Sequence, residues 1–281
     1  MAAEVSTRAK VWMGVASIPI ILYALLPIGW MISLSVKPNS DINDGKYWPR
    51  HWTFANYKGI LWGYAHSLFL PALRNSVGIC VIATVIGVGL STFCAYAIAR
   101  LEFPGKKLIL TSALGVAVFP VISIVTPLFN LWRSLGLYNT WIGLIIPYLS
   151  LTLPLSIWVL TAFFRQIPWE MEQAAQVDGA TSWQAFRKVV VPLATPGVFT
   201  TAIITFFTTW NDFVYAESLT STSASQTVPP ALASFTGASQ FVQPYGAISA
   251  AGIVVTIPVV LLVLIFQKRI VSGLTAGAVK G

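Results

Sequence analysis

Six apolar runs of about 20 residues or more recur along this chain, and they constrain its fold more than any other feature. A run of that length can cross roughly 30 Å of hydrocarbon as an α-helix. Hydrophobic residues make up 56% of the chain and charged residues 9%, which would leave large apolar patches exposed on a soluble domain. The runs lie at about 11–36, 76–99, 108–131, 141–164, 197–216 and 247–267. We therefore predict an all-α integral membrane protein whose six transmembrane helices form one domain over residues 1–281.

The distribution of Lys and Arg indicates how these helices are oriented. If the amino terminus is cytoplasmic, eleven basic residues lie in the inner segments and six in the outer ones, as the positive-inside rule requires. Both termini are then expected in the cytoplasm, and the external loop 217–246 contains no Lys or Arg. The run 11–36 is longer than the core of a signal peptide and ends at no clear cleavage site, so we expect it to remain as a helix. The net charge of +8 therefore indicates membrane topology rather than a nucleic-acid partner.

Residues that would support a metal site or an enzyme are scarce. Cys80 and Cys94 both fall in the second run, and the two His residues, His51 and His66, lie in the first external loop. We find no cluster of His, Asp or Glu with the pattern of a catalytic site, and no phosphate-binding loop of the Gly-x-x-x-x-Gly-Lys-Ser/Thr type. We therefore expect no enzyme activity, and no metal or nucleotide bound by this chain.

The loop 165–196 between the fourth and fifth runs is predicted to contain two short helices. Pro168 opens the first, and Glu170 and Glu172 lie in its first turn, where the helix dipole favours acidic side chains. Gly179 follows the end of this helix, where a left-handed residue is needed.

The second short helix has its own start signal. Thr181 with Gln184 three residues later forms the capping-box pattern, and Pro192 and Pro196 then interrupt the chain before the fifth run. These signals predict a helix–turn–helix elbow in the cytosol. The elbow is either an ordinary amphipathic connector or a segment that contacts a partner in the water phase.

On these residues the chain resembles a known family. Residues 172–197 are similar to the cytoplasmic motif of the permeases of ATP-binding-cassette importers, which reads Glu-Ala-Ala, two or three variable residues, Asp-Gly-Ala and a distal Pro. The matching positions are Ala174, Ala175, Asp178, Gly179, Ala180, Phe186 and Pro192. The segments 135–140, 210–212 and 273–281 look like the carbohydrate-uptake branch, the relatives of the smaller permease of the maltose transporter. Within that branch the chain looks most like the permeases of trehalose importers from mycobacteria and related actinobacteria.

The resemblance implies the importer permease fold, in which a cytoplasmic coupling helix docks on an ATPase subunit and drives alternating access. It implies as partners a second, related permease chain in a heterodimer, two ATPase subunits, an extracytoplasmic sugar-binding lipoprotein and membrane lipid. ATP and Mg would be bound by the ATPase subunits. The implied function is import of a disaccharide, best matched by trehalose, across the plasma membrane of a bacterium. An ion-gradient-driven secondary transporter of a small solute is the alternative, although such proteins normally carry acids near the bilayer midplane.

By the same resemblance, seven residues of the elbow are expected to form the ATPase-coupling site: Glu172, Gln173, Ala174, Ala175, Asp178, Gly179 and Phe186. The chain departs from the motif at one position, because Gln173 stands where many members of the family have the motif's Glu. Glu172 comes immediately before it, and we expect Glu172 to make the charged contact with the ATPase. Gln173 is the alternative, and it can only form hydrogen bonds.

The fifth run carries the candidate residues of the substrate pathway: Thr201, Thr205, Thr208, Trp210, Asn211 and Asp212. The three Thr residues and Asp212 are spaced four, three and four residues apart, which places them on one helical face. An acid within a membrane is costly and usually faces a cavity or a partner. The alternatives are that the Thr hydroxyls bond to their own helix, that water reaches Asp212 near the helix end, and that Trp210 belongs to the aromatic belt.

Three aromatic residues near the end of the last external loop are assigned by the resemblance to contact with the sugar-loaded binding protein: Phe235, Phe241 and Tyr245. The alternative is that these rings dip into the lipid interface.

Three further features predict local structure. Asn75 and the pair Asn139–Thr140 are expected to cap helices where the chain enters the membrane. The stretch 119–127 contains two Pro residues, which predicts either a break or a packing kink in the third run. The tail 271–281 is rich in Gly and too polar to continue the sixth helix, so we expect it to project into the cytosol.

Overall fold

The computed structural model describes residues 7–235 and 244–278, and for residues 7–11 and 267–278 it describes the backbone alone. Throughout these ranges the chain folds into helices joined by turns and loops, and no strand occurs in them. The prediction of an all-α protein is confirmed. Four helices in the described ranges are long and apolar enough to span a membrane, and the number rises to six if each of two sharply bent helix pairs is counted as one span.

The chain divides into two compact units. The first comprises Met1–Leu70 and Ser234–Ile257, and the second comprises Pro71–Ala233 and Pro258–Gly281. Two long helices, α3 (His66–Arg100) and α13 (Tyr245–Ala278), contribute residues to both units.

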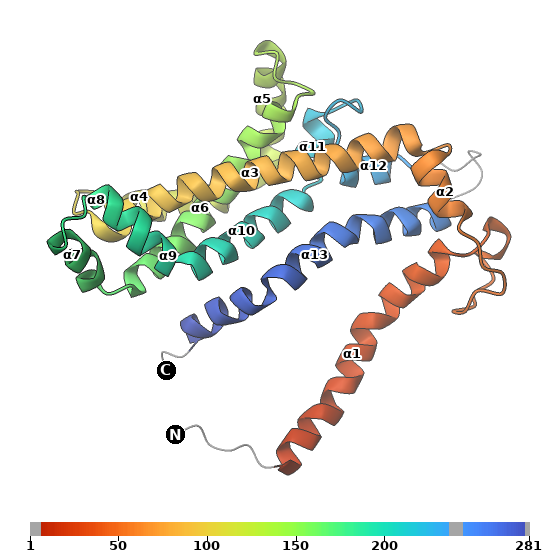
Figure 1. Cartoon of the computed structure of the whole chain (residues 1–281). Helices are drawn as coiled ribbons and strands as arrows, with labels where there is room; N and C mark the ends of the chain where they lie inside the picture. The colour runs from red at the N-terminus through yellow and green to blue at the C-terminus, as the bar shows by residue number, and fades with distance from the viewer. Residues whose placement is uncertain (1–6, 236–243, 279–281) are drawn as a thin grey trace. The chain divides into compact units, whose positions relative to one another are not determined.

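The first unit contains α1 (Thr7–Ser35) and the loop that follows it. The span Trp12–Ser35 is apolar, and the chain itself buries none of its most apolar window, so that surface is available to lipid or to another chain. A short 3₁₀ turn, Asn39–Asp41, and the helix α2 (Ala55–Trp62) come next (Figure 1).

A buried lysine organises the loop after α1. Lys37 Nζ lies 2.8 Å from Asp44 Oδ1, and the Lys37 side chain is 0% exposed. The same ammonium group donates to the carbonyl of Lys46 and lies 5.1 Å from the centre of the Trp30 ring. The hydrogen bond from Lys37 lowers the pKa of the Asp44 carboxyl below its usual value. The Asp44 carboxylate therefore stays charged at neutral pH, and its contact with Lys37 holds the loop against the end of α1.

The second unit contains most of α3 and the following helices: α4 (Lys106–Ala117), α5 (Val121–Ser134), α6 (Trp141–Gln166), α7 (Trp169–Val177), α8 (Ser182–Ala185), a π-helical turn (Phe186–Val190), α9 (Val191–Leu193), α10 (Thr195–Trp210), α11 (Val214–Leu219) and α12 (Val228–Ala233). Two clusters of buried hydrophobic side chains lie in this unit. One includes Ile79, Leu144, Tyr148 and Tyr215, and the other includes Ala95, Leu160, Phe164, Phe186 and Val190.

The helices α3, α6 and α10 approach one another closely at Gly87 of α3. A Cβ at this position would lie 3.3 Å from Leu149 and 3.7 Å from Thr152, both on α6, and 3.7 Å from Thr205 on α10. Helices in lipid associate through such small residues, since no hydrophobic force drives them together there.

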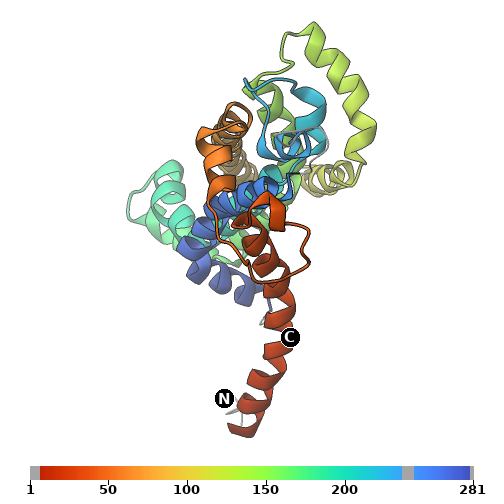
Figure 2. The same cartoon turned by 90° about the vertical axis from the view of Figure 1, so that its right-hand side faces the viewer.

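The third apolar run is broken rather than kinked. The helices α4 and α5 meet at 91° across residues 118–120, and Figure 2 shows α5 turning away from α4. Pro120 has no N–H to continue the helical ladder and disfavours helical geometry at Phe119. Pro127 lies inside α5 without ending it. Of the two predictions for 119–127, the break is therefore the one confirmed.

Two helices end elsewhere than predicted. The helix α10 stops at Trp210, and residues 214–219 form the separate helix α11, so the run 197–216 is not one helix. The helix α13 continues to Ala278, so the prediction that the tail leaves the helix is wrong for residues 271–278. This segment contains no Pro, and a Gly inside a helix costs only about 1 kcal/mol. Residues 279–281 lie outside the described residues.

Asn75 does not cap a helix, because α3 already begins at His66. Its side-chain amide instead donates to the carbonyl oxygens of Ser223 at 2.9 Å and Gln226 at 3.0 Å. The prediction failed because it placed the helix start at the first apolar residue, whereas the helix extends beyond the apolar run.

Thr140 caps α6 as predicted, since its hydroxyl accepts from the Gly143 N–H at 3.0 Å. Asn139 has a different role. It adopts a left-handed conformation with φ 58°, and its side-chain oxygen accepts from the Ser221 N–H at 3.0 Å and the Ser225 hydroxyl at 2.9 Å. Asn139 thereby holds the loop after α11.

Cysteine labelling tests the predicted orientation in the membrane. Ala224 is exposed in the loop after α11, and Ser182 is exposed at the start of α8. In a chain whose Cys80 and Cys94 are replaced by Ser, we expect Ala224→Cys to react with an impermeant maleimide on intact cells. Ser182→Cys should react only after the membrane is opened. The reverse pattern of labelling would contradict a topology with both termini in the cytoplasm.

Candidate functional site

The helix α7 begins and ends where the sequence predicts. Pro168 is its N-cap residue, and Glu170 and Glu172 occupy its first turn. Its C-cap is Asp178, and Gly179 then takes the left-handed conformation with φ +89°. No atom lies within 4 Å of the place where a Cβ on Gly179 would be, so the backbone angle, not lack of space, favours glycine.

The capping box of α8 is also confirmed. The Thr181 hydroxyl accepts from the Gln184 N–H at 3.2 Å, and the Gln184 side chain accepts from the Thr181 N–H at 2.9 Å. The helix α8 continues into the π-helical turn Phe186–Val190, and the chain bends by 72° before α10. Pro196 lies in the first turn of α10, where the missing N–H costs nothing, and Pro192 comes shortly after the π-helical turn.

Phe186 attaches the elbow to α3. Its side chain is buried, and its ring centre lies 4.6 Å from that of Tyr96 and 5.7 Å from that of Phe93, both on α3. Trp183 of α8 stacks on the same ring at 5.4 Å. Figure 1 shows α7 and α8 at the carboxyl end of α3. The match of Phe186 to the motif thus reflects a packing position, which seats the elbow on the helix beside it.

Glu172 is turned into the protein. It is 3% exposed, and its Oε1 accepts a hydrogen bond of 2.5 Å from the Tyr96 hydroxyl. Its Oε2 lies 3.5 Å from Arg100 Nε, and the two side chains are 4% and 6% exposed. These two atoms are within ion-pair distance but form no hydrogen bond. The carboxylate is therefore held by one hydrogen bond and one buried countercharge.

Arg100 connects this carboxylate to the start of α7. Its Nη2 donates to the carbonyl of Ile167 at 2.9 Å, in the link between α6 and α7. The guanidinium also lies 4.9 Å from the centre of the Trp169 ring, a cation–π distance. Arg100 thus contacts the end of α6 and both ends of the first turn of α7.

The prediction that Glu172 makes the charged contact with a partner is wrong for this structure, because its carboxylate is already paired inside the chain. The exposed side of α7 and its end carries other residues: Glu170, Gln173, Ala174, Val177 and Asp178. Val177 is the most exposed of them that is apolar and large, with 86% of its surface exposed. Sequence spacing gave no sign of the pairing, since Arg100 and Glu172 lie on different helices.

The predicted pathway face of α10 is divided between opposite environments. Thr201 is 1% exposed and Thr205 0%, and the Thr205 hydroxyl lies 3.1 Å from that of Ser156 on α6. Thr208 is exposed, but its hydroxyl bonds to the carbonyl of Ile204 in its own helix. The three Thr residues lie on one face of α10, whereas Asp212 lies beyond the end of this helix. The Thr205 hydroxyl joins α10 to α6, as one of the alternatives proposed, whereas the Thr201 hydroxyl is buried and has no hydrogen-bond partner among the described residues.

Asp212 lies beyond the end of α10 and starts the next helix. Its Oδ2 accepts from the Tyr148 hydroxyl at 3.1 Å and from the Ala216 N–H at 3.0 Å, within the first turn of α11. Trp210 is buried and stacks on Phe206 at 5.2 Å. Asn211 is exposed, and its amide donates to a carbonyl of α10. Asp212 thus has a local structural role at the start of α11, which the spacing in the sequence did not indicate.

The three aromatic residues assigned to a binding protein differ in exposure. Phe235 is buried, with 7% of its surface exposed, whereas Tyr245 is 49% exposed at the start of α13. Phe241 lies outside the described residues. A buried Phe235 cannot act as an exposed docking ring, so this part of the prediction is wrong.

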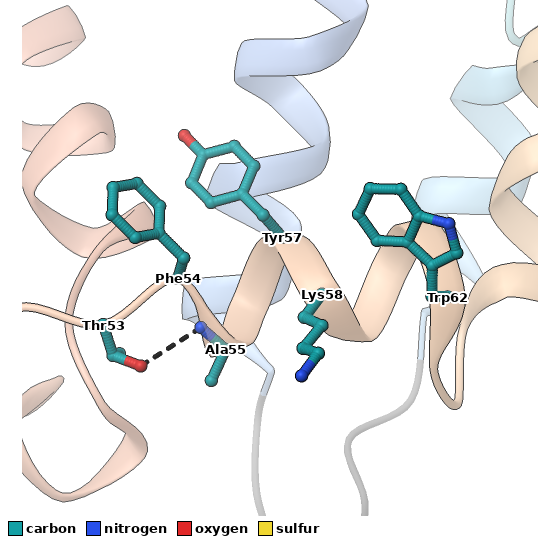
Figure 3. A pocket seen from close by; sticks show the side chains of 6 residues that line it. All are labelled: Thr53, Phe54, Ala55, Tyr57, Lys58 and Trp62. Carbon is teal, nitrogen blue, oxygen red and sulfur yellow. Dashed lines mark hydrogen bonds between the residues drawn. The ribbon is translucent and has the colours of Figure 1, made fainter.

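A hollow of about 540 Å³ lies beside α2, a helix that the sequence patterns did not single out. Figure 3 shows its lining: Thr53, Phe54, Ala55, Tyr57, Lys58 and Trp62. Phe54 and Trp62 are 72% and 76% exposed. Aromatic rings with one ammonium group are typical of side chains at a membrane–water interface.

No group of three or more His, Cys, Asp or Glu residues that could hold a metal ion occurs within residues 7–235 and 244–278. Among the described residues, the features around α7 that could serve a function are the buried ion pair, the packing of α7 on α3 and the exposed face of α7.

Comparison with known proteins assigns this arrangement to a family. The family described as binding-protein-dependent transport system inner membrane component matches residues 87–275, which include Arg100, α7 and the whole elbow. The chain therefore belongs to this family of multi-pass transport permeases.

Two named relatives match over nearly the whole chain. The trehalose transport system permease protein SugB of Mycobacterium tuberculosis is 56% identical over 274 residues, which cover 98% of each chain. The trehalose/maltose transport system permease protein MalG of Thermococcus litoralis is 38% identical over 282 residues, which cover both chains completely. A bacterial ABC transporter that imports alginate has the same fold, with a TM-score of 0.78 at 22% identity over 95% of this chain and 99% of that one.

Replacement of Gly179 by Ala tests the turn between α7 and α8. A left-handed backbone costs a residue with a Cβ about 1–2 kcal/mol, so Gly179→Ala should lower the unfolding temperature of the purified permease and reduce uptake at equal membrane abundance. Gly89→Ala is the matched control, because the space around Gly89 is also open but Gly89 lies inside α3. An unchanged unfolding temperature and uptake for Gly179→Ala would contradict the strained turn.

Proposed function

We propose that this chain is the permease subunit of an ATP-driven importer of a disaccharide, with trehalose as the substrate, and that it forms half of the translocation pathway. The observation that carries the proposal is the construction of α7. One side is locked to α3 through Glu172 and the other is exposed around Val177. The names of two relatives, from Mycobacterium tuberculosis and Thermococcus litoralis, support trehalose as the substrate. Membership of a binding-protein-dependent family speaks against the alternative of an ion-gradient-driven transporter.

The exposed side of α7 docks on a cytoplasmic ATPase subunit. Gln173 and Ala174 are both exposed there, and a small residue such as Ala174 lets a helix lie close against another surface. Gln173 can donate and accept hydrogen bonds, so it replaces Glu172 as the polar contact with the ATPase. Movement of the ATPase then reaches the membrane helices through the buried side of α7.

The remaining subunits follow from the same mechanism. A second, related permease chain completes the pathway as a heterodimer, and two ATPase subunits bind ATP and Mg and hydrolyse the nucleotide. An extracytoplasmic sugar-binding lipoprotein delivers the substrate, a role consistent with the family's description. A structure of the alginate transporter in complex with its periplasmic protein gives a precedent for such an assembly, with a TM-score of 0.63 to this chain. Alternating access then arises from rocking of the two permease chains about a site between them.

A sugar panel tests the substrate. Cells that lack their own trehalose uptake should import labelled trehalose when they express this chain together with the permease, ATPase and binding protein that are encoded by the neighbouring genes. Unlabelled trehalose should compete at least tenfold better than maltose or sucrose, because a site built for one arrangement of hydroxyls leaves polar groups unpaired with another. Equal competition by all three sugars would contradict trehalose as the preferred substrate.

A bulky charge on α7 tests the docking surface. We expect Ala174→Arg to abolish co-purification of the ATPase and sugar uptake, because the side chain would hold the two surfaces apart. Ala224→Arg is the matched control, since Ala224 is equally exposed but lies in the loop after α11. If Ala174→Arg retains the ATPase and transports sugar at the normal rate, α7 is not the contact.

A further inference from the structure

A single helix, α3, carries a polar contact at each of its two ends. We propose that α3 transmits movement across the membrane from the coupling helix to the loop after α11. The inner clamp joins Tyr96 and Arg100 of α3 to α7. The outer clamp joins Asn75 and Ser76 of α3 to residues 223–228. The proposal rests on the proposed function, because docking of an ATPase on α7 supplies the movement that the inner clamp passes on.

The inner clamp contacts α7 at two levels. The Tyr96 hydroxyl donates to Glu172 at 2.5 Å, in the first turn of α7. Arg100 lies 3.5 Å from the same carboxylate and donates to the Ile167 carbonyl just before α7, at 2.9 Å. Because both the helix and the segment before it are held by α3, a displacement of α7 has to displace the end of α3.

The outer clamp is made of hydrogen bonds that two buried side chains of α3 form with the loop after α11. The Asn75 amide donates to the carbonyls of Ser223 at 2.9 Å and Gln226 at 3.0 Å. The Ser76 hydroxyl accepts from the Val228 N–H at 2.8 Å, at the start of α12. Asn75 and Ser76 are 4% and 1% exposed. The loop after α11 therefore follows this end of α3.

The helix between the clamps is uninterrupted. Pro71 is the one Pro inside α3, and it precedes both clamps. At 1.5 Å per residue, Asn75 and Tyr96 lie about 30 Å apart along the helix axis, which is the thickness of the hydrocarbon core. A continuous helix of that length moves as a rod, so a rotation or shift imposed at Tyr96 appears at Asn75.

The chemistry of the inner clamp favours transmission over simple stabilisation. A buried ion pair is a poor source of stability, since apolar side chains of the same size stabilise as well or better. Arg100 Nε and Glu172 Oε2 even lack a hydrogen bond. Polar contacts fix the relative orientation of the two groups that they join, because a hydrogen bond is strong only at defined angles. The clamp therefore fixes the orientation of α7 relative to α3.

A double-mutant cycle on the assembled transporter tests whether α3 transmits movement between the two clamps as a rigid rod. The complex of this chain, its partner permease, the ATPase and the loaded binding protein is reconstituted in liposomes, and sugar imported per ATP hydrolysed is measured at equal assembly. We expect Glu172→Gln and Asn75→Ala each to lower this ratio about fivefold to tenfold. The double variant should fall no further than the worse single variant, because both clamps act in series. Glu102→Gln is the matched control, an acid 91% exposed just beyond the end of α3.

Two outcomes would contradict the proposal that α3 acts as a rigid rod. Sites this far apart normally contribute independently, so a double variant whose loss equals the product of the two single losses would show that no rod joins them. A normal ratio for either single variant would do the same. If Glu172→Gln or Asn75→Ala fails to assemble, Tyr96→Phe and Ser76→Ala remove one hydroxyl group each and enter the same cycle, with the same expectation of non-additivity.

The docking variant separates this proposal from the proposed function. If Ala174→Arg loses the ATPase while both clamp variants keep the normal ratio, the coupling site stands and only the rod is wrong. If Ala174→Arg keeps the ATPase and the normal rate of uptake, the proposed function itself fails.

Discussion

Burial of the Glu172 carboxylate beside Arg100 is the contact on which the elbow depends. Two charges that are almost fully enclosed hold each other in place, since removing one partner of such a pair costs about 3–5 kcal/mol. The hydrogen bond from Tyr96 adds direction to this attraction. The contact also decides which side of α7 meets the water phase. Because Glu172 points inward, Gln173 and Val177 are left on the surface.

The membrane imposes a second constraint, on how the helices of the second unit pack. Apolar side chains gain little from leaving lipid, so close contact relies on small residues and hydroxyl groups. Gly87 allows α3, α6 and α10 to approach, and Thr205 pairs with Ser156 across the α6–α10 contact. Thr205 of α10 is therefore used to join two helices. Within the polar pattern that suggested a sugar pathway, this residue has a packing role.

Local signals were reliable where the residues that act on each other are close in sequence. The capping box of Thr181 and Gln184, the left-handed Gly179 and the cap at Thr140 all formed as predicted, because each involves backbone groups within one turn. The break before α5 follows from Pro120 in the same way. Predictions of helix ends were wrong where the helix extends beyond its apolar run. This happens at His66, the start of α3, and after residue 270 in α13.

The sequence by itself determined the class of protein and the position of the elbow between α6 and α10. Runs of apolar residues and the spacing of Pro, Gly and capping residues are local properties, and local properties can be read along the chain. Only the tertiary structure decided that Glu172 faces Arg100 and that Asp212 accepts a hydrogen bond from the Tyr148 hydroxyl. The partners in each pair lie on different segments, and which side chains meet depends on how the helices rotate against one another as they pack.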